Sequence, residues 1–153
     1  MIRRTNQRMT ICLFLLVATL LFIWGNSLLP ASASSALSRW VGTLLGMDFQ
    51  GSGEAGQGVL RKLAHFSEFA FLGGVLFWLY AMMLRKQRSV VAAGFGCGVL
   101  TACVDEWLQS FSSGRNPSLI DVSIDSAGAA VGLGLLLIGY IISSNKKLIL
   151  EEN

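Results

Sequence analysis

The chain has 153 residues, of which 53% are hydrophobic and 14% charged, and its formal net charge is +3. This composition is typical of an integral membrane protein, because the apolar residues gather in stretches of about 20, the length that crosses a bilayer as a helix. It excludes a separate soluble domain, and so small a positive charge gives no indication of nucleic-acid binding.

The sequence predicts an all-α fold, a polytopic membrane bundle of four transmembrane helices that forms a single domain over residues 1–153. Helices are expected because lipid offers no hydrogen bonds to the backbone. A short amphipathic helix is expected outside the membrane, between the first two spans. The predicted spans are Met9–Leu29, Leu63–Leu84, Val90–Leu108 and Leu119–Ile142.

The first span has an alternative interpretation. Arg3 and Arg4, the apolar run and the tripeptide at 31–33 together imitate a cleaved secretory signal peptide. The apolar run of about 21 residues is longer than the usual core of such a signal. Trp24 and Asn26 also interrupt the approach to the cleavage site. We therefore favour a retained span.

The connection between the first two spans has two parts. Ser34–Met47 places apolar residues at helical spacing, which predicts a surface helix with Trp40 among the lipid headgroups. Gly51–Gly58 is rich in Gly and Ser, which predicts a flexible segment.

Basic residues beside the spans predict the topology. Eight lie on the side of the two termini: Arg3, Arg4, Arg8, Arg85, Lys86, Arg88, Lys146 and Lys147. Four lie on the other side: Arg39, Arg61, Lys62 and Arg115. Because cytoplasmic flanks carry the excess of Lys and Arg, both termini are expected in the cytoplasm of a multi-pass cell-membrane protein.

Ionisable and amide side chains lie at one depth of this bundle. They occupy the outer third of their spans, and they are His65, Glu68, Asp105, Glu106, Gln109, Asp121 and Asp125. An ionisable group in hydrocarbon costs at least ~2.5–3.5 kcal/mol, so a set of them in one layer indicates a functional site.

Helical spacing predicts that most of these groups face each other. Glycines four residues apart allow membrane helices to approach closely, and here they share their stripes with polar residues. One stripe contains Gly94, Gly98, Asp105 and Gln109, and another contains Asp121, Asp125, Gly128 and Gly132. His65 and Glu68 share a face at i, i+3. Glu106 lies about 100° round from Asp105 and is expected to point elsewhere.

This layer predicts several kinds of chemistry. His65, Glu68, Asp105, Glu106, Asp121 and Asp125 are candidate catalytic groups, since Asp, Glu and His perform acid–base work. Lys62, Gln109 and Arg115 are candidate substrate-binding groups. Acids outnumber bases, so the layer must hold a cation, stay hydrated or keep some acids protonated. A divalent cation with oxygen ligands is one alternative, and an interhelical hydrogen-bond cluster that fixes helix register is another.

Two basic residues carry alternatives of their own. Arg115 suits bidentate recognition of a phosphate or carboxylate, but an interfacial anchor or a salt bridge to Asp121 would also explain it. Lys62 suits a lipid phosphate or a flank that reaches the headgroups. Since it would oppose the positive N-terminus of the second span, an acidic partner is expected nearby.

Two motifs resemble the signatures of the VanZ-like membrane protein family. The first is Lys62-x-x-His65-Phe66-x-Glu68-Phe69, and the second is Asp105-Glu106-x-x-Gln109-x-Phe111-x-x-Gly114-Arg115, which continues through Asp121-Val122-x-x-Asp125-x-x-Gly128-x-x-x-Gly132. The resemblance covers nearly half the chain. In the first span only Ser27 and Pro30 resemble the family, as a Ser/Pro turn.

The resemblance implies a bacterial cell-envelope protein. The family is named for a protein that gives low-level antibiotic resistance to teicoplanin, a glycopeptide that binds cell-wall precursors outside the membrane. Expected partners are membrane lipids and a lipid-linked cell-wall precursor or the glycopeptide. Two other classes stay open: an ion- or proton-coupled transporter, and a structural or partner-binding membrane protein without catalysis.

Overall fold

The computed structural model describes residues 2–44, 46 and 53–151, and this part of the chain contains helices and no strand. The all-α prediction is therefore confirmed. In chain order the helices are α1 (Ile2–Leu28), α2 (Ala31–Leu44), α3 (Gly53–Met83), α4 (Gln87–Gln109) and α5 (Leu119–Glu151).

Four of these helices are long and apolar enough to cross a membrane, as predicted. The qualifying segments are Asn6–Leu28, Gly58–Met83, Gln87–Gln109 and Leu119–Asn145. Large apolar side chains such as Phe14, Leu21 and Leu135 are exposed on their outer faces. A soluble protein seldom exposes apolar surface so extensively, whereas a bilayer would cover it. The chain is a multi-pass membrane protein.

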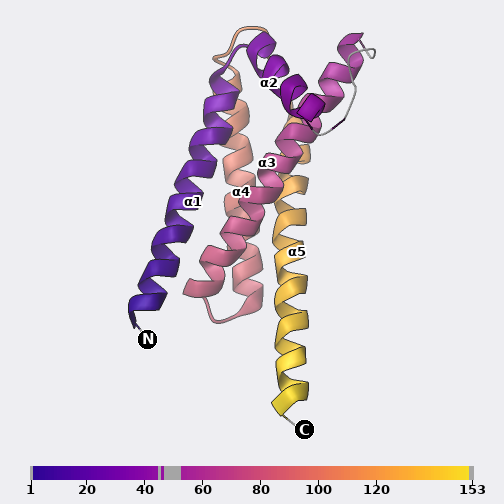
Figure 1. Ribbon diagram of the computed structural model, residues 1–153. Coiled ribbons are helices and arrows are strands. Elements are labelled where there is room, and N and C mark those ends of the chain that lie inside the picture. The colour runs from indigo at the N-terminus through magenta and orange to yellow at the C-terminus, as the bar shows by residue number, and fades with distance from the viewer. Residues whose placement is uncertain (1, 45, 47–52, 152–153) are drawn as a thin grey trace.

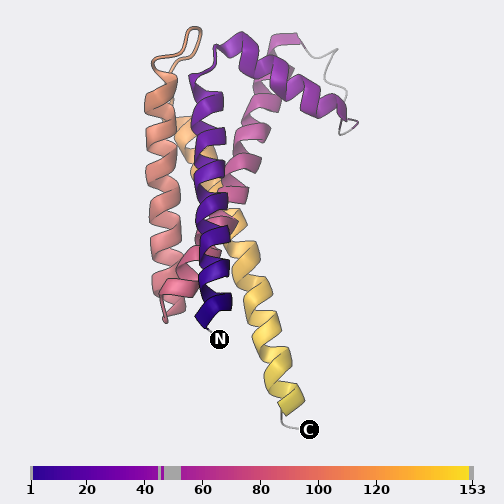
Figure 2. The ribbon, with the colours of Figure 1, turned by 60° about the vertical axis from the view of Figure 1, so that its left-hand side comes forward.

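The four long helices run lengthwise beside each other (Figures 1 and 2). Both termini lie at the lower end of the bundle in Figure 1, together with the α3–α4 turn. At the upper end lie α2 and the connection between α4 and α5. The basic turn Arg85–Arg88 is thus at the same end as the termini, as the predicted topology requires; which end faces the cytoplasm stays a prediction.

Glycines bring α5 directly against α3, which makes this the most extensive helix pair. A Cβ on Gly128 would collide with the backbone carbonyl of Phe66, and one on Gly132 with that of Ala70. On α4, a Cβ on Gly98 would lie 2.8 Å from the Cβ of Ala129. The predicted close approach along these stripes is confirmed, and it brings the polar ends of α3, α4 and α5 together.

The connection between the first two spans differs from the prediction. The surface helix exists but runs over Ala31–Leu44, and residues 45 and 47 lie outside the described part. The flexible segment at Gly51–Gly58 is wrong for residues 53–58, which form the first turns of α3; residues 51 and 52 are not described. Each glycine lowers the stability of a helix by only about 1 kcal/mol. Two effects offset this cost: the segment extends a long helix that is already formed, and that helix contacts α2.

Candidate functional site

The upper end of the bundle holds a group of polar side chains, buried except for the half-buried Glu68, here called the polar cluster. It consists of Asn26, Ser27, His65, Glu68, Asp105, Gln109 and Asp125. These residues come from α1, α3, α4 and α5, so the cluster exists only in the packed bundle. Of the six side chains predicted to converge, five belong to the cluster. The sixth, Asp121, lies at its edge, where it pairs with Lys62 and lines a cavity with His65 and Asp125.

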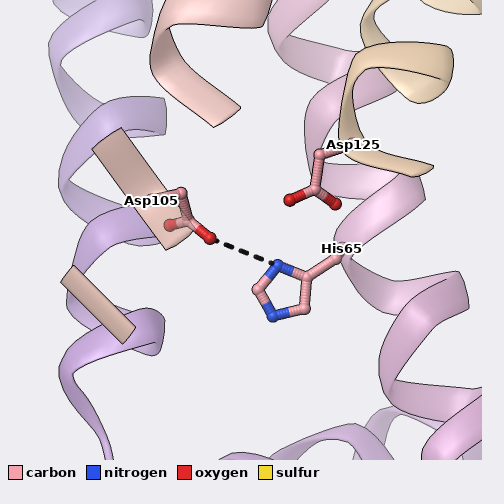
Figure 3. Close-up of side chains that lie close together, drawn as sticks. All are labelled: His65, Asp105 and Asp125. Atoms are coloured by element: carbon pink, nitrogen blue, oxygen red, sulfur yellow. Dashed lines mark ion pairs between the residues drawn. The ribbon is translucent and has the colours of Figure 1, made fainter. Parts of the chain in front are cut away.

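Three side chains form the centre of the polar cluster. His65 is 6% exposed, Asp105 0% and Asp125 2%. Nδ1 of His65 lies 3.7 Å from Oδ2 of Asp105, and Figure 3 shows the imidazole ring turned toward that carboxylate with Asp125 beside it. One donor atom from each of the three residues lies within 4.8 Å of the other two. The arrangement can hold a proton or a cation between groups from three helices.

Both carboxylate oxygens of Asp105 are held by hydrogen-bond donors. Ser27 donates its hydroxyl to Oδ1 at 2.6 Å, and Gln109 donates its amide to Oδ2 at 2.8 Å. Gln109 lies one helical turn after Asp105, so α4 provides this bond locally, whereas Ser27 reaches across from α1. The two bonds fix the orientation of the carboxylate that faces His65.

Glu68 points to a different partner from His65. Its Oε1 accepts a hydrogen bond from the side-chain amide of Asn26 at 3.2 Å, and Asn26 in turn accepts one from the hydroxyl of Ser34 at 3.0 Å. The i, i+3 spacing predicts a shared face for His65 and Glu68, but His65 faces α4 and α5 while Glu68 is bonded to α1. The centre of the cluster thus combines His65 with Asp105 and Asp125, and not with Glu68.

Glu106 is buried beside the cluster but holds the next connection, which agrees with its expected separate direction. Its Oε1 accepts a hydrogen bond from the backbone N–H of Ser118 at 2.6 Å. Ser118 precedes α5, and its hydroxyl accepts from the N–H of Ile120 at 3.2 Å. Glu106 thus positions the start of α5, the helix that carries Asp121 and Asp125.

Arg115 closes the end of α1. Its Nη2 donates to the backbone carbonyl of Asn26 at 3.1 Å, while Ser112 donates its hydroxyl to the carbonyl of Ser27 at 2.8 Å. Carbonyls at a helix C-terminus lack partners within the helix, and a cation there is favourable. Gly114 makes this loop possible with a φ of 76°. The salt bridge from Arg115 to Asp121, one of the alternatives that the sequence left open, is not formed, because Asp121 pairs with Lys62.

The guanidinium of Arg115 is buried, and two of its nitrogens, Nε and Nη1, have no hydrogen-bond partner among the described residues. Burial, and then the charge of Arg61 nearby, lower the pKa of Arg115. Arginine nevertheless stays protonated in proteins, so it places a positive charge beside the acids of the cluster.

Lys62 has the acidic partner that the sequence predicts, since its Nζ lies 3.3 Å from Oδ1 of Asp121. The reason given for that partner was wrong: α3 begins at Gly53, so Lys62 is more than two turns from the helix N-terminus. Next to this pair is a cavity of about 10 Å³, lined by Arg61, Lys62, His65, Gln109, Asp121, Ile124 and Asp125. That volume admits one water molecule or a small ion.

The sequence prediction omitted Asn26 and Ser27 from the site. The first span is otherwise so apolar that the sequence indicates Asn26 as an interruption and Ser27 as part of a turn. Their depth could have indicated that they belong to the site. They lie near the outer end of the first span, at the same depth as Glu68 and Asp105.

Comparisons with known proteins agree with these motifs. A sequence model of the VanZ/LLP1 family matches residues 9–142, which include the two middle spans, most of the first and last spans and every residue of the polar cluster. No curated protein and no solved structure matches the chain. The family match covers most of the sequence, and the chain therefore belongs to the VanZ/LLP1 family.

Proposed function

We propose that this VanZ-like protein acts at the extracytoplasmic face of a bacterial cell membrane on an amphipathic envelope substrate, such as a lipid-linked cell-wall precursor. The observation that carries the proposal is the buried polar cluster at the end of the bundle opposite the termini. A bundle that needed only stability would fill this space with apolar side chains, because buried ionisable groups are costly.

The cavity beside the cluster supports a site at its edge. Arg61 and Lys62 line it together with His65 and Asp125, so positive and acid–base groups meet at one opening. Because the cavity has room for only a water-sized group, the apolar part of a substrate would remain in the surrounding lipid. The polar cluster would then meet the headgroup, where a phosphate suits the basic side chains.

Family membership gives the phenotype to test, which is lowered susceptibility to a glycopeptide of the teicoplanin type. An ion- or proton-coupled transporter is less well supported. The residues packed below the cluster form an apolar core, with Ile23, Phe69, Leu72, Leu76, Ala102 and Ala129 all buried. In the described part of the chain, the buried members of this core carry no ionisable side chain, so the core offers no row of charged groups toward the other end of the bundle.

A structural role is the second candidate, and a specific observation favours it. The hydrogen bonds of Ser27 with Asp105 and of Asn26 with Glu68 tie α1 to α4 and α3. Interhelical bonds of this kind stabilise membrane bundles by about 0.6–2 kcal/mol each. The cluster would then fix helix register without acting on a substrate.

Isosteric substitutions separate the two candidates. Glu68→Gln and Asp125→Asn remove a charge with little change in volume, and Asn116→Asp, in the exposed α4–α5 connection, is the control for an equally small change. Each variant is expressed in a teicoplanin-susceptible bacterium. We expect the parent and Asn116→Asp to raise the inhibitory concentration of teicoplanin. The Glu68→Gln and Asp125→Asn variants should leave that concentration unchanged.

Immunoblots of the membrane fraction complete this test. Normal abundance with lost protection supports a functional cluster. If both cluster variants protect as well as the parent, the cluster is structural and the proposal is wrong. If they disappear from the membrane while Asn116→Asp remains, the second candidate is supported.

A further inference from the structure

His65 lacks the partners that a buried imidazole needs. Its side chain is 6% exposed, yet neither Nδ1 nor Nε2 makes a hydrogen bond to any described residue. An unsatisfied buried polar group costs about 1–3 kcal/mol. The ring is nevertheless held facing Asp105, with Nδ1 3.7 Å from the nearer oxygen, and Asp125 lies beside it (Figure 3). One imidazole and two carboxylates thus converge without a hydrogen bond from the imidazole to either carboxylate.

Charge favours a cation at this convergence. Five acids lie in this part of the bundle, Glu68, Asp105, Glu106, Asp121 and Asp125, together with three bases, Arg61, Lys62 and Arg115. If all are ionised, two negative charges remain. Two of the bases also have partners of their own, since Lys62 pairs with Asp121 and Arg115 binds the carbonyl of Asn26. A single divalent cation would neutralise the excess.

We infer that His65, Asp105 and Asp125 bind a divalent metal ion of the Mg²⁺ or Mn²⁺ class. One nitrogen and two carboxylate ligands give a mixed, oxygen-rich set, which suits Mn²⁺ in particular, and such ions keep water in their remaining positions. The adjoining cavity of about 10 Å³, which His65 and Asp125 line, is large enough for one such water.

The distances are close to those of an assembled site. Two ligand atoms at about 2.2 Å from one ion lie at most about 4.4 Å apart. Neighbouring ligand atoms lie closer, about 3.1 Å apart, and the three donor atoms lie within 4.8 Å of each other, so side-chain rotations that bring them together by up to about 2 Å would complete the site. Asp105 is already oriented for this by Ser27 and Gln109, which hold its two oxygens as outer partners hold a metal-binding carboxylate.

Mn²⁺ itself is the probe for the test. The full chain is purified in detergent, stripped with a chelator and titrated with Mn²⁺, and free Mn²⁺ is followed by electron paramagnetic resonance. We expect one saturable site per chain. Asp125→Asn should weaken binding by about 100-fold or more, and Ser27→Ala, which removes an outer partner, by about 10-fold. Asp121→Asn removes the same charge outside the trio, so it is the matched control and must weaken binding less than Asp125→Asn.

A spectroscopic readout decides the ligand itself. Bound Mn²⁺ should show coupling to an imidazole nitrogen in the parent chain, and His65→Gln should lose it. Absence of saturable binding in the parent, absence of nitrogen coupling, or equal weakening by Asp121→Asn and Asp125→Asn would each overturn the inference. The nitrogen coupling is measured on the parent chain, so this readout does not depend on whether any variant folds. No antibiotic or substrate enters the measurement, so the metal site and the proposed function succeed or fail separately.

Discussion

Arg115 shows how one side chain can serve both stability and the site. It donates to the carbonyl of Asn26 at the end of α1 and places a buried positive charge near the acids of the polar cluster. Ser112 caps the neighbouring carbonyl of Ser27 with a neutral hydroxyl. Arg115 therefore caps one carbonyl with a charged group and Ser112 caps its neighbour with a neutral one. Comparing them separates the contribution of the charge from that of the hydrogen bond.

Substituting these two caps measures that contribution. Ser112→Ala should lower the free energy of unfolding by about 1 kcal/mol, the worth of a neutral hydrogen bond. Arg115→Gln, which keeps a donor but removes the charge, should lower it by about 3 kcal/mol, because buried acids lose their cation. Arg115→Lys should recover most of the difference. Reversible unfolding in mixed micelles gives these values, and equal losses for Ser112→Ala and Arg115→Gln would contradict the role of the charge.

At the scale of the helices, α5 is positioned by glycines along one face. Gly128 and Gly132 lie against backbone carbonyls of α3, while Gly134 and Gly139, further along α5, have open space around them. Because the backbones of α3 and α5 touch at Gly128 and Phe66, Asp125 and His65, each within one turn of this contact, lie close together. The polar cluster therefore depends on apolar packing just below it.

A methyl group at these glycines tests that dependence. Gly132→Ala must push α5 from α3, and overpacking of this kind costs about 1–3 kcal/mol. Gly134→Ala adds the same methyl to the same helix where nothing lies within 4 Å, so it should be neutral. Unfolding in mixed micelles measures both variants. Similar stability for Gly132→Ala and Gly134→Ala would show that the close packing of α3 and α5 is not needed.

The sequence predicted the helices better than the contacts between them. Hydropathy located four spans, because lipid requires length and apolar character that few other structures need. It did not locate the start of α3 at Gly53, since glycine and serine indicate a loop and tertiary contact with α2 decides otherwise. The depth of each polar residue along its span predicted correctly which residues lie in one layer. Which of them make contact depends on how each helix is rotated about its own axis, which the sequence does not give. For this reason the face predicted to be shared by His65 and Glu68 does not make them partners, and Glu68 bonds to Asn26.

The first span shows the same limit. Its apolar sequence was compared with a signal peptide, yet α1 contacts α3 and α4 and supplies Asn26 and Ser27 to the cluster. Hydrogen bonds to the carboxylates of Glu68 and Asp105 are typical of a helix that stays in the bundle, so they favour retention of α1. Retention itself stays a prediction, as does the catalytic or binding role of each candidate residue.

At the scale of the whole molecule, polarity is divided between the two ends. The buried polar cluster and α2 lie at one end, and the termini and the basic turn Arg85–Arg88 lie at the other. Trp40 on α2 is 62% exposed, as expected of an aromatic side chain among lipid headgroups. The proposed action on an envelope substrate requires the end with the cluster to face outward.

Topology reporters test this requirement directly. The eight-to-four distribution of basic residues predicts cytoplasmic termini. Alkaline phosphatase folds only outside the cytoplasm because it needs disulfides, so a fusion after residue 47 should be active and one after Lys86 inactive. A fluorescent protein that matures in the cytoplasm should give the opposite pattern at the same two sites. Replacing Arg85, Lys86 and Arg88 by Gln should raise the share of inverted chains, because orientation follows the positive charge. If the parent chain gives the inverse result with both reporters, the cluster faces the cytoplasm, and an extracytoplasmic substrate is ruled out.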